Sequence, residues 1–503
     1  MPTAHLTIDP GAVVGAVNRR LFGSFVEHLG RCVYDGIYEP GHPTSDANGF
    51  RGDVVELVKE LGVSAIRYPG GNFVSGYRWE DGVGPRDQRP RRLDLAWHST
   101  ETNEVGLDEF ATWLERVGSE LMYAVNLGTR GVQEALDVLE YANIRSGTRL
   151  SDWRIANGRT EPHRVGIWCL GNEMDGPWQL GHGTADEYGA LAAKTARAMR
   201  QIDPHIELVV CGSSSAQMPT FGTWERTVLE HTYDDVDYIS CHAYYEPADG
   251  DVDSFLASAV NMDGFIETVV AVADEVKASK RSDKTMNISF DEWNVWYMQR
   301  HLAEEKITDI EHWPVAPRLL EDSYSLLDAV VFGSLLISLL KHADRVTSAS
   351  LAQLVNVIAP IMTEPGGPAW RQTIFFPFAE TSRLAGGEAL ALTLRSDTHL
   401  TGQYGEVNLV DAAATHAAGA TAIFLVNRST TDPAEVTIDV SALGDVAVAS
   451  ARTLSDSDLS AANTLEHPER VALADNNSVL LSNGVLTITL PPVSWTALSV
   501  TSN

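Results

Sequence analysis

The chain has 503 residues, of which 44% are hydrophobic and 8% aromatic, which is typical of a globular protein with one large domain and a smaller one. Lysine and arginine total 37 against 68 acidic residues, for a formal charge of −31. This charge excludes nucleic acids and anionic membrane surfaces as partners. The acidic residues are scattered along the chain, so we interpret them as a solvated surface without a chemical role.

The N-terminus, MPTAHLTIDPGAVVGAVNRR, lacks the basic start and apolar core of a secretory signal, so we expect a cytoplasmic protein. The most apolar window, Leu326 to Leu340, is too short to span a bilayer and contains Asp328. It predicts a helix buried against a sheet. No CxxC pair occurs among the four cysteines, so neither a disulfide framework nor a zinc site is predicted.

Between residues 19 and 384, short apolar runs alternate with segments of helical period. The expected strands span 21–27, 64–68, 121–126, 165–170, 207–211, 236–242, 286–291 and 348–355. Helical segments are expected at 53–61, 107–117, 132–144, 185–202, 224–233, 265–278 and 326–340, with none assigned after the last strand. Eight parallel strands joined by helices close a sheet, so we predict the α/β class and a catalytic (β/α)8 TIM barrel over 19–384.

From residue 385 the pattern changes to alternating apolar and polar runs such as TAIFLVNRS and GVLTITLPP, separated by turn residues. This texture predicts an additional C-terminal antiparallel β-sandwich over 385–503. Residues 1–18 are also strand-like and precede the first barrel strand, so we expect an N-terminal strand to join the sandwich.

Active sites of such barrels lie at the carboxyl ends of the strands, so the residues that end each apolar run are the candidates. Most of these ends carry amide, carboxyl, imidazole or phenol groups. They are Glu27, Asn72, Asn126, Asn172, Glu173, His242, Tyr244, Asp291, Glu292, Gln353 and Asn356.

Two glutamates, Glu173 and Glu292, end otherwise apolar runs. Two carboxyl groups facing each other across a pocket suit glycoside hydrolysis, in which one protonates the leaving oxygen and the other attacks the sugar. Amides bind sugar hydroxyls, and aromatic faces cover the ring. The aromatic residues near these ends are Trp97, Trp178, Tyr244, Trp293, Trp296 and Tyr297.

Structural interpretations of the same residues remain open at this point. A single glutamate at a strand end can cap a helix or form a salt bridge. Glu27 and His28 could form a structural pair, and the tryptophans after the seventh strand could be packing. Two other functions compete, a metal-dependent barrel hydrolase that uses His242, His28 and aspartates, and a sugar-binding protein without activity.

In chain order the sequence contains SFVEHLGRCVYDGIYEP, RYPGGNF, GNEMDGPWQLGH, HAYYEP, SFDEWNVWY and AQLVNVIAP. These motifs resemble those of the α-L-arabinofuranosidases of glycoside hydrolase family 51 over essentially the whole chain. The resemblance implies a retaining, exo-acting enzyme without metal or other cofactor, with Glu173 as acid/base and Glu292 as nucleophile. It also implies substrate binding by Glu27, Asn72, Asn172, His242, Tyr244 and Gln353, beside the aromatic Trp97 and Trp296.

The expected substrates are arabino-oligosaccharides and arabinoxylan fragments that carry terminal arabinofuranosyl groups. A related retaining enzyme for another sugar, such as a β-xylosidase or an endoglucanase, is the alternative. Members of the resembled family are often hexamers, so we expect a homo-oligomer. For a retaining mechanism, the carboxyls of Glu173 and Glu292 should lie about 5 Å apart.

Overall fold

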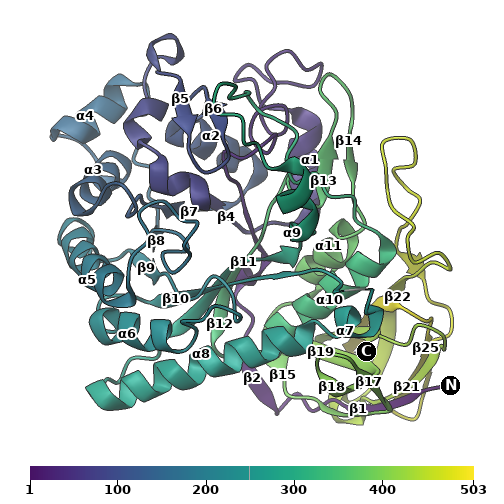
Figure 1. Ribbon diagram of the computed structural model, residues 1–503. Helices are drawn as coiled ribbons and strands as arrows, with labels where there is room; N and C mark the ends of the chain where they lie inside the picture. Colours follow the sequence, from purple (N-terminus) through teal and green to yellow (C-terminus); the bar gives the residue numbers. More distant parts are fainter. Residues whose placement is uncertain (249, 503) are drawn as a thin grey trace.

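The computed structural model describes residues 1–248 and 250–502 of the chain. Figure 1 shows a barrel surrounded by helices and a β-sandwich that lies against one side of it. The predicted α/β class, with a (β/α)8 barrel and a C-terminal β-sandwich, is confirmed. Within these ranges no helix combines the length and the apolar character that crossing a bilayer requires.

Eight parallel strands close the barrel in the order β10, β11, β12, β3, β4, β7, β8 and β9. Their bounds are Gly23–Phe25 (β3), Ala65–Tyr68 (β4), Glu120–Ala124 (β7), Ile167–Leu170 (β8), Glu207–Val210 (β9), Tyr238–Tyr245 (β10), Asn287–Val295 (β11) and Val346–Leu351 (β12). Each overlaps one of the predicted runs. The runs are mostly apolar because side chains fill the inside of such a barrel and helices cover its outside.

Two barrel strands extend beyond their predicted ends. The apolar runs were expected to stop at His242 and Asp291, but backbone pairing continues to Tyr245 in β10 and to Val295 in β11. His242 pairs with Glu292 in this extension. Polarity in the sequence therefore marks where the barrel mouth begins, and the hydrogen-bonded ladder continues past that point.

The described helices of ten or more residues match the predicted segments, with one addition. They are α1 (Gly52–Leu61), α2 (Leu107–Val117), α3 (Val132–Asn143), α5 (Ala185–Ile202), α6 (Thr223–Thr232), α8 (Ala259–Lys280), α10 (Leu326–Lys341) and α11 (Phe375–Leu384). Helix α11 follows β12 and was not predicted. Its clustered aromatic residues and Pro377 hide the helical period, although proline is tolerated in a first helical turn.

Helix α10 is the buried helix predicted from the apolar window. Ser325 caps its N-terminus by accepting a hydrogen bond from the Asp328 amide, while the Asp328 carboxylate accepts from the Ser325 N–H at 2.7 Å. The helix contacts β11 on the barrel side and β19, β20 and β26 on the sandwich side. A helix that is apolar all round is stable where both sides are covered, so α10 is the central element of this interface.

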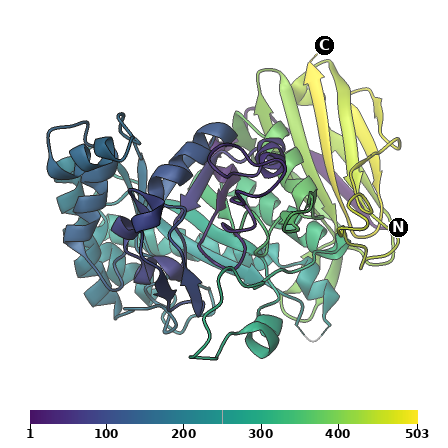
Figure 2. The same ribbon diagram turned by 90° about the horizontal axis from the view of Figure 1, so that it is seen from above.

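Two sheets form the sandwich, with strand orders β16-β1-β21-β25-β24 and β2-β15-β19-β20-β26-β22-β23. The bounds are Thr3–Thr7 (β1), Val13–Ala16 (β2), Glu388–Leu390 (β15), Thr393–Ser396 (β16), Val410–Ala417 (β19), Ala420–Asn427 (β20), Ala434–Asp439 (β21), Val446–Leu454 (β22), Ala474–Asp475 (β23), Leu480–Ser482 (β24), Val485–Leu490 (β25) and Ser494–Ser502 (β26). Figure 2 shows N-terminal chain among these C-terminal strands. The β1–β21 pair is parallel, whereas the other pairs of these two sheets are antiparallel.

A short hairpin lies over the barrel mouth and consists of β5 (Arg92–Asp94) and β6 (Ser99–Glu101). Its base is fixed by Glu101, whose carboxylate lies 2.9 Å from His28 Nδ1. The partner of His28 is therefore Glu101, and not Glu27 as considered from the sequence. The hairpin also meets the segment between β11 and α10, where the Thr100 N–H donates to the Pro314 carbonyl at 2.9 Å. This arrangement brings Trp97, at the tip of the hairpin, to the barrel mouth.

Candidate active site

A small pocket of about 50 Å³ opens at the carboxyl ends of the barrel strands. Most of the residues singled out from the sequence line it, and Asn172 and His242 lie directly behind the lining carboxyls. The lining residues from that set are Glu27, Asn72, Trp97, Glu173, Tyr244, Glu292, Trp296 and Gln353. Apolar residues that sequence reasoning did not select, including Phe25, Leu320 and Ile358, complete the wall.

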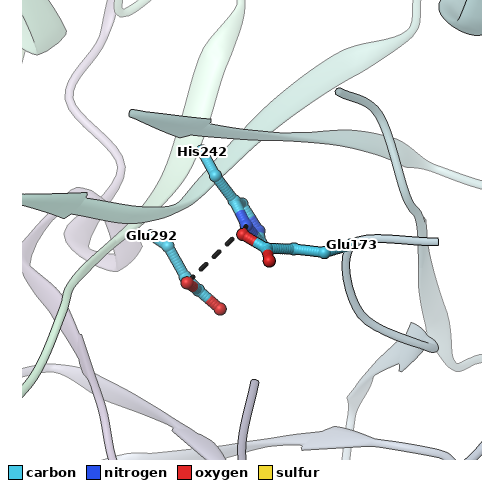
Figure 3. A group of neighbouring side chains, drawn as sticks. All are labelled: Glu173, His242 and Glu292. Atoms are coloured by element: carbon cyan, nitrogen blue, oxygen red, sulfur yellow. Dashed lines mark hydrogen bonds and ion pairs between the residues drawn. The ribbon is translucent and has the colours of Figure 1, made fainter. Parts of the chain in front are cut away.

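Glu173, which follows β8, and Glu292, within β11, approach each other beside His242 of β10 (Figure 3). One carboxyl oxygen of each glutamate and one His242 nitrogen all lie within 4.8 Å of one another. Retaining glycosidases hold their two carboxyl groups about 5 Å apart, whereas inverting enzymes need roughly 6.5–9.5 Å to admit water. The spacing matches the retaining arrangement.

His242 is buried among three carboxylates. Its Nδ1 lies 2.9 Å from Glu173 Oε1 and 3.6 Å from Glu292 Oε2, and its Nε2 lies 2.9 Å from Asp291 Oδ1. Burial opposes a positive charge on the ring, but these carboxylates outweigh it and hold the pKa of His242 well above its usual value. The imidazolium therefore offsets part of the negative charge that the site concentrates.

Glu292 receives two strong hydrogen bonds. Arg67 Nη1 donates to Oε1 at 2.7 Å, and the Tyr244 hydroxyl donates to Oε2 at 2.7 Å. Burial raises the pKa of Glu292, opposed by the charges of His242 and Arg67 and by the Tyr244 hydrogen bond. Burial also holds the pKa of Tyr244 well above its usual value, so this phenol remains a donor. Both oxygens of Glu292 are thereby held in fixed positions.

Arg67 was not selected from the sequence, although it lies at the centre of the site. Its Nη2 donates to Asn172 Oδ1 at 2.6 Å while Nη1 binds Glu292, so one guanidinium fixes two candidate residues. The signal was present in the sequence, because an arginine inside the buried strand β4 is costly unless it is paired. Asn172 also donates to Asn72 at 3.4 Å, which links the two candidate amides.

Glycine gives the backbone room where the loop after β4 passes the carboxyls. A Cβ on Gly71 would lie 3.1 Å from Glu292 Oε1 and 3.3 Å from Glu27 Oε2. Such contacts would crowd both acids, so the PGG sequence does more than form a turn. It lets the backbone approach the pocket and places Asn72 at the barrel mouth.

Glu27 forms a second buried acidic centre. Its Oε1 accepts hydrogen bonds from the Phe73 amide at 2.8 Å and the Trp97 indole at 2.9 Å, and its Oε2 accepts from Gln353 Nε2 at 3.1 Å. Burial raises the pKa of Glu27 to about 8, although the Phe73 and Trp97 hydrogen bonds oppose the shift. Glu27 thus ties together the hairpin, the loop after β4 and the end of β12.

The loop after β8 carries a strained backbone at Glu173, which has a φ of +43°. A left-handed conformation is uncommon outside glycine and marks positions where the surrounding structure fixes the geometry. The turn is closed by a hydrogen bond from the Gly176 amide to the Glu173 carbonyl at 2.9 Å. This conformation directs the Glu173 carboxyl back into the pocket.

Several candidates from the sequence have structural contacts instead. Asn126 donates hydrogen bonds to the Tyr77 carbonyl and to the Thr129 hydroxyl, which lies in the loop after β7. Trp293 is fully buried against Phe332, with the ring centroids 4.7 Å apart. The other two are Tyr297, which binds the Asp328 carboxylate at 2.8 Å, and Asn356, which binds Thr363.

Metal binding is the alternative use of the same side chains. Among the residues that the structure describes, Glu173, His242 and Glu292 form the group with metal-ligand spacing. A cation there would meet the guanidinium of Arg67, 2.7 Å from Glu292, and an imidazole that favours its protonated form. The arrangement therefore suits proton transfer and nucleophilic attack better than metal binding.

Two family models match the chain. The model described as "Alpha-L-arabinofuranosidase 1 domain" matches residues 57–259, and that described as "Alpha-L-arabinofuranosidase C-terminal domain" matches residues 291–494. Together they include Glu173 and Glu292.

Similar proteins cover the whole chain. An intracellular exo-α-(1→5)-L-arabinofuranosidase of Streptomyces lividans is 61% identical over 99% of this chain and 75% of its own length. An exo-α-(1→6)-L-arabinofuranosidase of Bifidobacterium longum is 60% identical, with 99% and 97% of the two chains covered. A solved family 51 α-L-arabinofuranosidase from Bifidobacterium longum superposes with a TM-score of 0.95 at 51% identity, and 99% of each chain is covered.

Proposed function

The chain belongs to the family 51 α-L-arabinofuranosidases, and from this premise we propose that Glu173 is its general acid/base and Glu292 its nucleophile. The enzyme removes terminal α-L-arabinofuranosyl groups and retains the configuration at the anomeric carbon. One observation carries the proposal that these two residues act as a retaining pair, because a carboxyl oxygen of Glu173 lies within 4.8 Å of a carboxyl oxygen of Glu292.

In the first step, a Glu292 oxygen attacks the anomeric carbon while Glu173 gives its proton to the departing oxygen. The bond to the leaving group breaks, and a covalent arabinosyl ester forms on Glu292. Arg67 and Tyr244 support this choice of nucleophile, because their two 2.7 Å hydrogen bonds orient the attacking carboxylate. The partners of Glu173 differ, because one is the buried imidazole of His242 and the other is the exposed indole of Trp178.

In the second step, the Glu173 carboxylate removes a proton from water, which attacks the same carbon. The ester bond to Glu292 breaks, arabinose leaves and both carboxyl groups return to their starting states. His242 supports this cycle because it lies within 3.6 Å of both glutamates and offsets their charge.

The remaining pocket residues bind the sugar in this proposal. Asn172, fixed by Arg67, is positioned to bond the 2-hydroxyl, a contact that strengthens as the ring approaches the transition state. The groups proposed to hold the other hydroxyls and the ring faces are Glu27, Asn72, Tyr244, Gln353, Trp97 and Trp296, while His242 acts through the glutamates that it contacts.

The proposed nucleophile can be tested by trapping the ester. Glu173→Ala lacks the base for the second step, so a nitrophenyl arabinofuranoside should load the variant with one arabinosyl group. Mass spectrometry of the digested protein should find the added mass on the peptide that contains Glu292. An added mass on another carboxyl, or none, would refute the assignment.

We further propose that the natural substrates are short arabino-oligosaccharides with terminal α-(1→5) linkages. The Streptomyces relative with that named specificity supports this choice, and the Bifidobacterium relative makes the α-(1→6) linkage the second candidate. Arabinofuranosidase names at 50–61% identity remove the xylosidase and endoglucanase alternatives. The kcat/KM values on (1→5)- and (1→6)-linked arabinobiose decide between the linkages, and a higher value on the (1→6) isomer would overturn the first choice.

We propose that the enzyme acts inside the cell as a homohexamer. Relatives named intracellular support the location, and the family resemblance of the sequence motifs supports the assembly. Light scattering on the purified protein should give six times the mass of one chain. A monomer mass would refute the hexamer.

A further inference from the structure

Both oxygens of Glu173 are already in contact with N–H groups or ring nitrogens of the protein. Oε1 lies 2.9 Å from His242 Nδ1, and Oε2 accepts a hydrogen bond from the Trp178 indole Nε1 at 2.7 Å. The oxygen of a leaving group must reach one of these positions to receive a proton. A leaving group that approaches either oxygen therefore competes for space with one of the two existing contacts.

Trp178 is the partner that can move. His242 is 2% exposed and is held on its far side by Asp291, whereas Trp178 is 53% exposed. Trp178 is absent from the residues that line the pocket, although it binds one that does. The indole thus covers the outer oxygen of Glu173 from the solvent side, where the leaving group must lie.

The backbone below the indole is fixed. Gln179, next to Trp178, is buried and donates from Nε2 to Ser75 Oγ at 2.5 Å. A Cβ on Gly176 would lie 2.5 Å from an indole carbon and 2.9 Å from the indole nitrogen. The ring therefore folds back across Gly176 to reach Glu173, and a larger residue at 176 would remove it from that place.

The hydrogen bond from the Trp178 indole to Glu173 is favourable at one stage of the catalytic cycle. An N–H donor stabilises and orients the carboxylate, which is the form Glu173 takes after the leaving group has departed with the proton. While the leaving group is present, the same N–H competes with it for Oε2. A donor that leaves Oε2 when the leaving group binds, and returns after the leaving group has departed, is compatible with both steps.

We propose that Trp178 is a positioning residue for Glu173 that the leaving group displaces. Its indole N–H holds Oε2 in the free enzyme and in the arabinosyl-enzyme, and the leaving-group oxygen takes its place in the substrate complex. In the second step the held carboxylate takes the proton of water while the ester bond to Glu292 breaks. The inference rests on the proposed role of Glu173 as acid/base.

Trp178→Phe keeps an aromatic ring and loses the N–H. On a nitrophenyl arabinofuranoside, whose easy departure makes the second step limiting, kcat should fall about tenfold, the worth of one hydrogen bond to a charged group. The kcat/KM value reports only the first step and should change less than twofold, so KM falls with kcat. Azide needs no base and should restore the kcat of the variant.

Gly176→Ala provides a second route to the same result, because it displaces the indole while Trp178 and Glu173 remain. It should show the same fall in kcat and the same response to azide. Gly41→Ala is the matched control, since a Cβ at that exposed glycine would meet nothing within 4 Å. Its kinetic constants should equal those of the parent enzyme.

Two results would overturn the proposal. A parallel fall of kcat and kcat/KM without azide rescue means that Trp178 only shapes the site. An unchanged kcat in Trp178→Phe means that the N–H has no part in the second step. Glu173→Ala, measured alongside, separates this failure from that of the proposed function, because it responds to azide whether or not Trp178 acts.

Discussion

The roles of the two pocket glutamates can be separated by how each variant fails. An acid matters only where the leaving oxygen is basic, so Glu173→Ala should keep far more of its first-step rate on a nitrophenyl arabinofuranoside than on an oligosaccharide. Azide should then release a glycosyl azide of retained configuration. Glu292→Ala has lost the attacking atom, and azide can react only from the opposite face to give the inverted product.

Each variant is assayed on both substrates, and the anomeric form of each azide product is determined by NMR. Loss of either group should lower oligosaccharide turnover by about 10²–10⁴-fold. Products of the opposite configuration would mean that the two roles are exchanged. A variant that responds to neither test would mean that its glutamate has a structural role.

Glu27 should make the stability of the protein depend on pH. Burial raises the pKa of this carboxyl to about 8. In the unfolded chain it ionises near its usual value, so the folded state loses stability as the pH rises from about 4.5 to 8. Glu27→Gln removes this loss, of the order of a few kcal/mol, without changing the size of the side chain.

The measurement is the melting temperature of both proteins from pH 4.5 to 9. The melting temperature of the variant should rise relative to that of the parent as the pH rises, and the difference should level off above pH 8. A constant difference across this range would contradict the buried, protonated state of Glu27.

Residues at the strand ends were predictable because barrel architecture fixes where an active site lies, and eight of the ten predicted site residues line the pocket. Arg67 was missed because it precedes the end of its strand and its partners, Asn172 and Glu292, lie 105 and 225 residues away in the chain. A single sequence does not show which distant acids will balance a buried arginine.

At the scale of single elements, the N-terminus of α10 offers a test of local stability. Ser325 and Asp328 exchange hydrogen bonds there, with the Ser325 hydroxyl donating to Asp328 at 2.8 Å. Ser325→Ala removes the cap and should cost about 1 kcal/mol of unfolding free energy. Urea denaturation of the parent and the variant measures the difference.

Thr223→Ala is a suitable control for that substitution, since Thr223 lies in an exposed first turn and its hydroxyl donates to the Thr220 carbonyl. It should cost less than Ser325→Ala. Equal losses would show that the cap of α10 has no special importance.

Periodicity located the eight barrel strands because each is a short apolar run between amphipathic helices. It failed for α11, where Phe375, Phe376, Pro377 and Phe378 replace the helical alternation. It also failed for the β5–β6 hairpin, whose strands have three residues each and whose position depends on the contact between Glu101 and His28. Tertiary contacts determine where such elements form, and these contacts are not visible in the periodicity of one sequence.

At the scale of the molecule, barrel and sandwich are joined by a charged cluster as well as by α10. Asp263 of α8 accepts from Lys341 at 2.8 Å and lies 3.1 Å from His342 Nε2, and Lys341 lies 3.5 Å from Asp411 of β19. Burial opposes ionisation of Asp263, but hydrogen bonds from His342, Lys341 and Ser338 outweigh it and hold its pKa well below the usual value.

A depressed pKa means that Asp263 contributes stability above pH 4 and that this contribution is lost as the pH falls. Asp263→Asn should therefore destabilise the protein at pH 7 by about 1–3 kcal/mol and flatten the decline of the melting temperature below pH 4. Calorimetry from pH 3 to 7 follows both. A parallel decline in the two proteins would exclude Asp263 from the acid transition.

The placement of β1 and β2 has a consequence for how the molecule is made. Both strands lie at the start of the chain, yet they pair with β16, β21 and β15, which follow the whole barrel. During synthesis on a ribosome these early residues must wait for residues 388–439 before they find a partner. Until then their backbone groups are open to other chains, and long-range pairing of this kind is slow. Nascent chains arrested near residue 384 should therefore associate with chaperones, and release should follow only when the last strands have emerged.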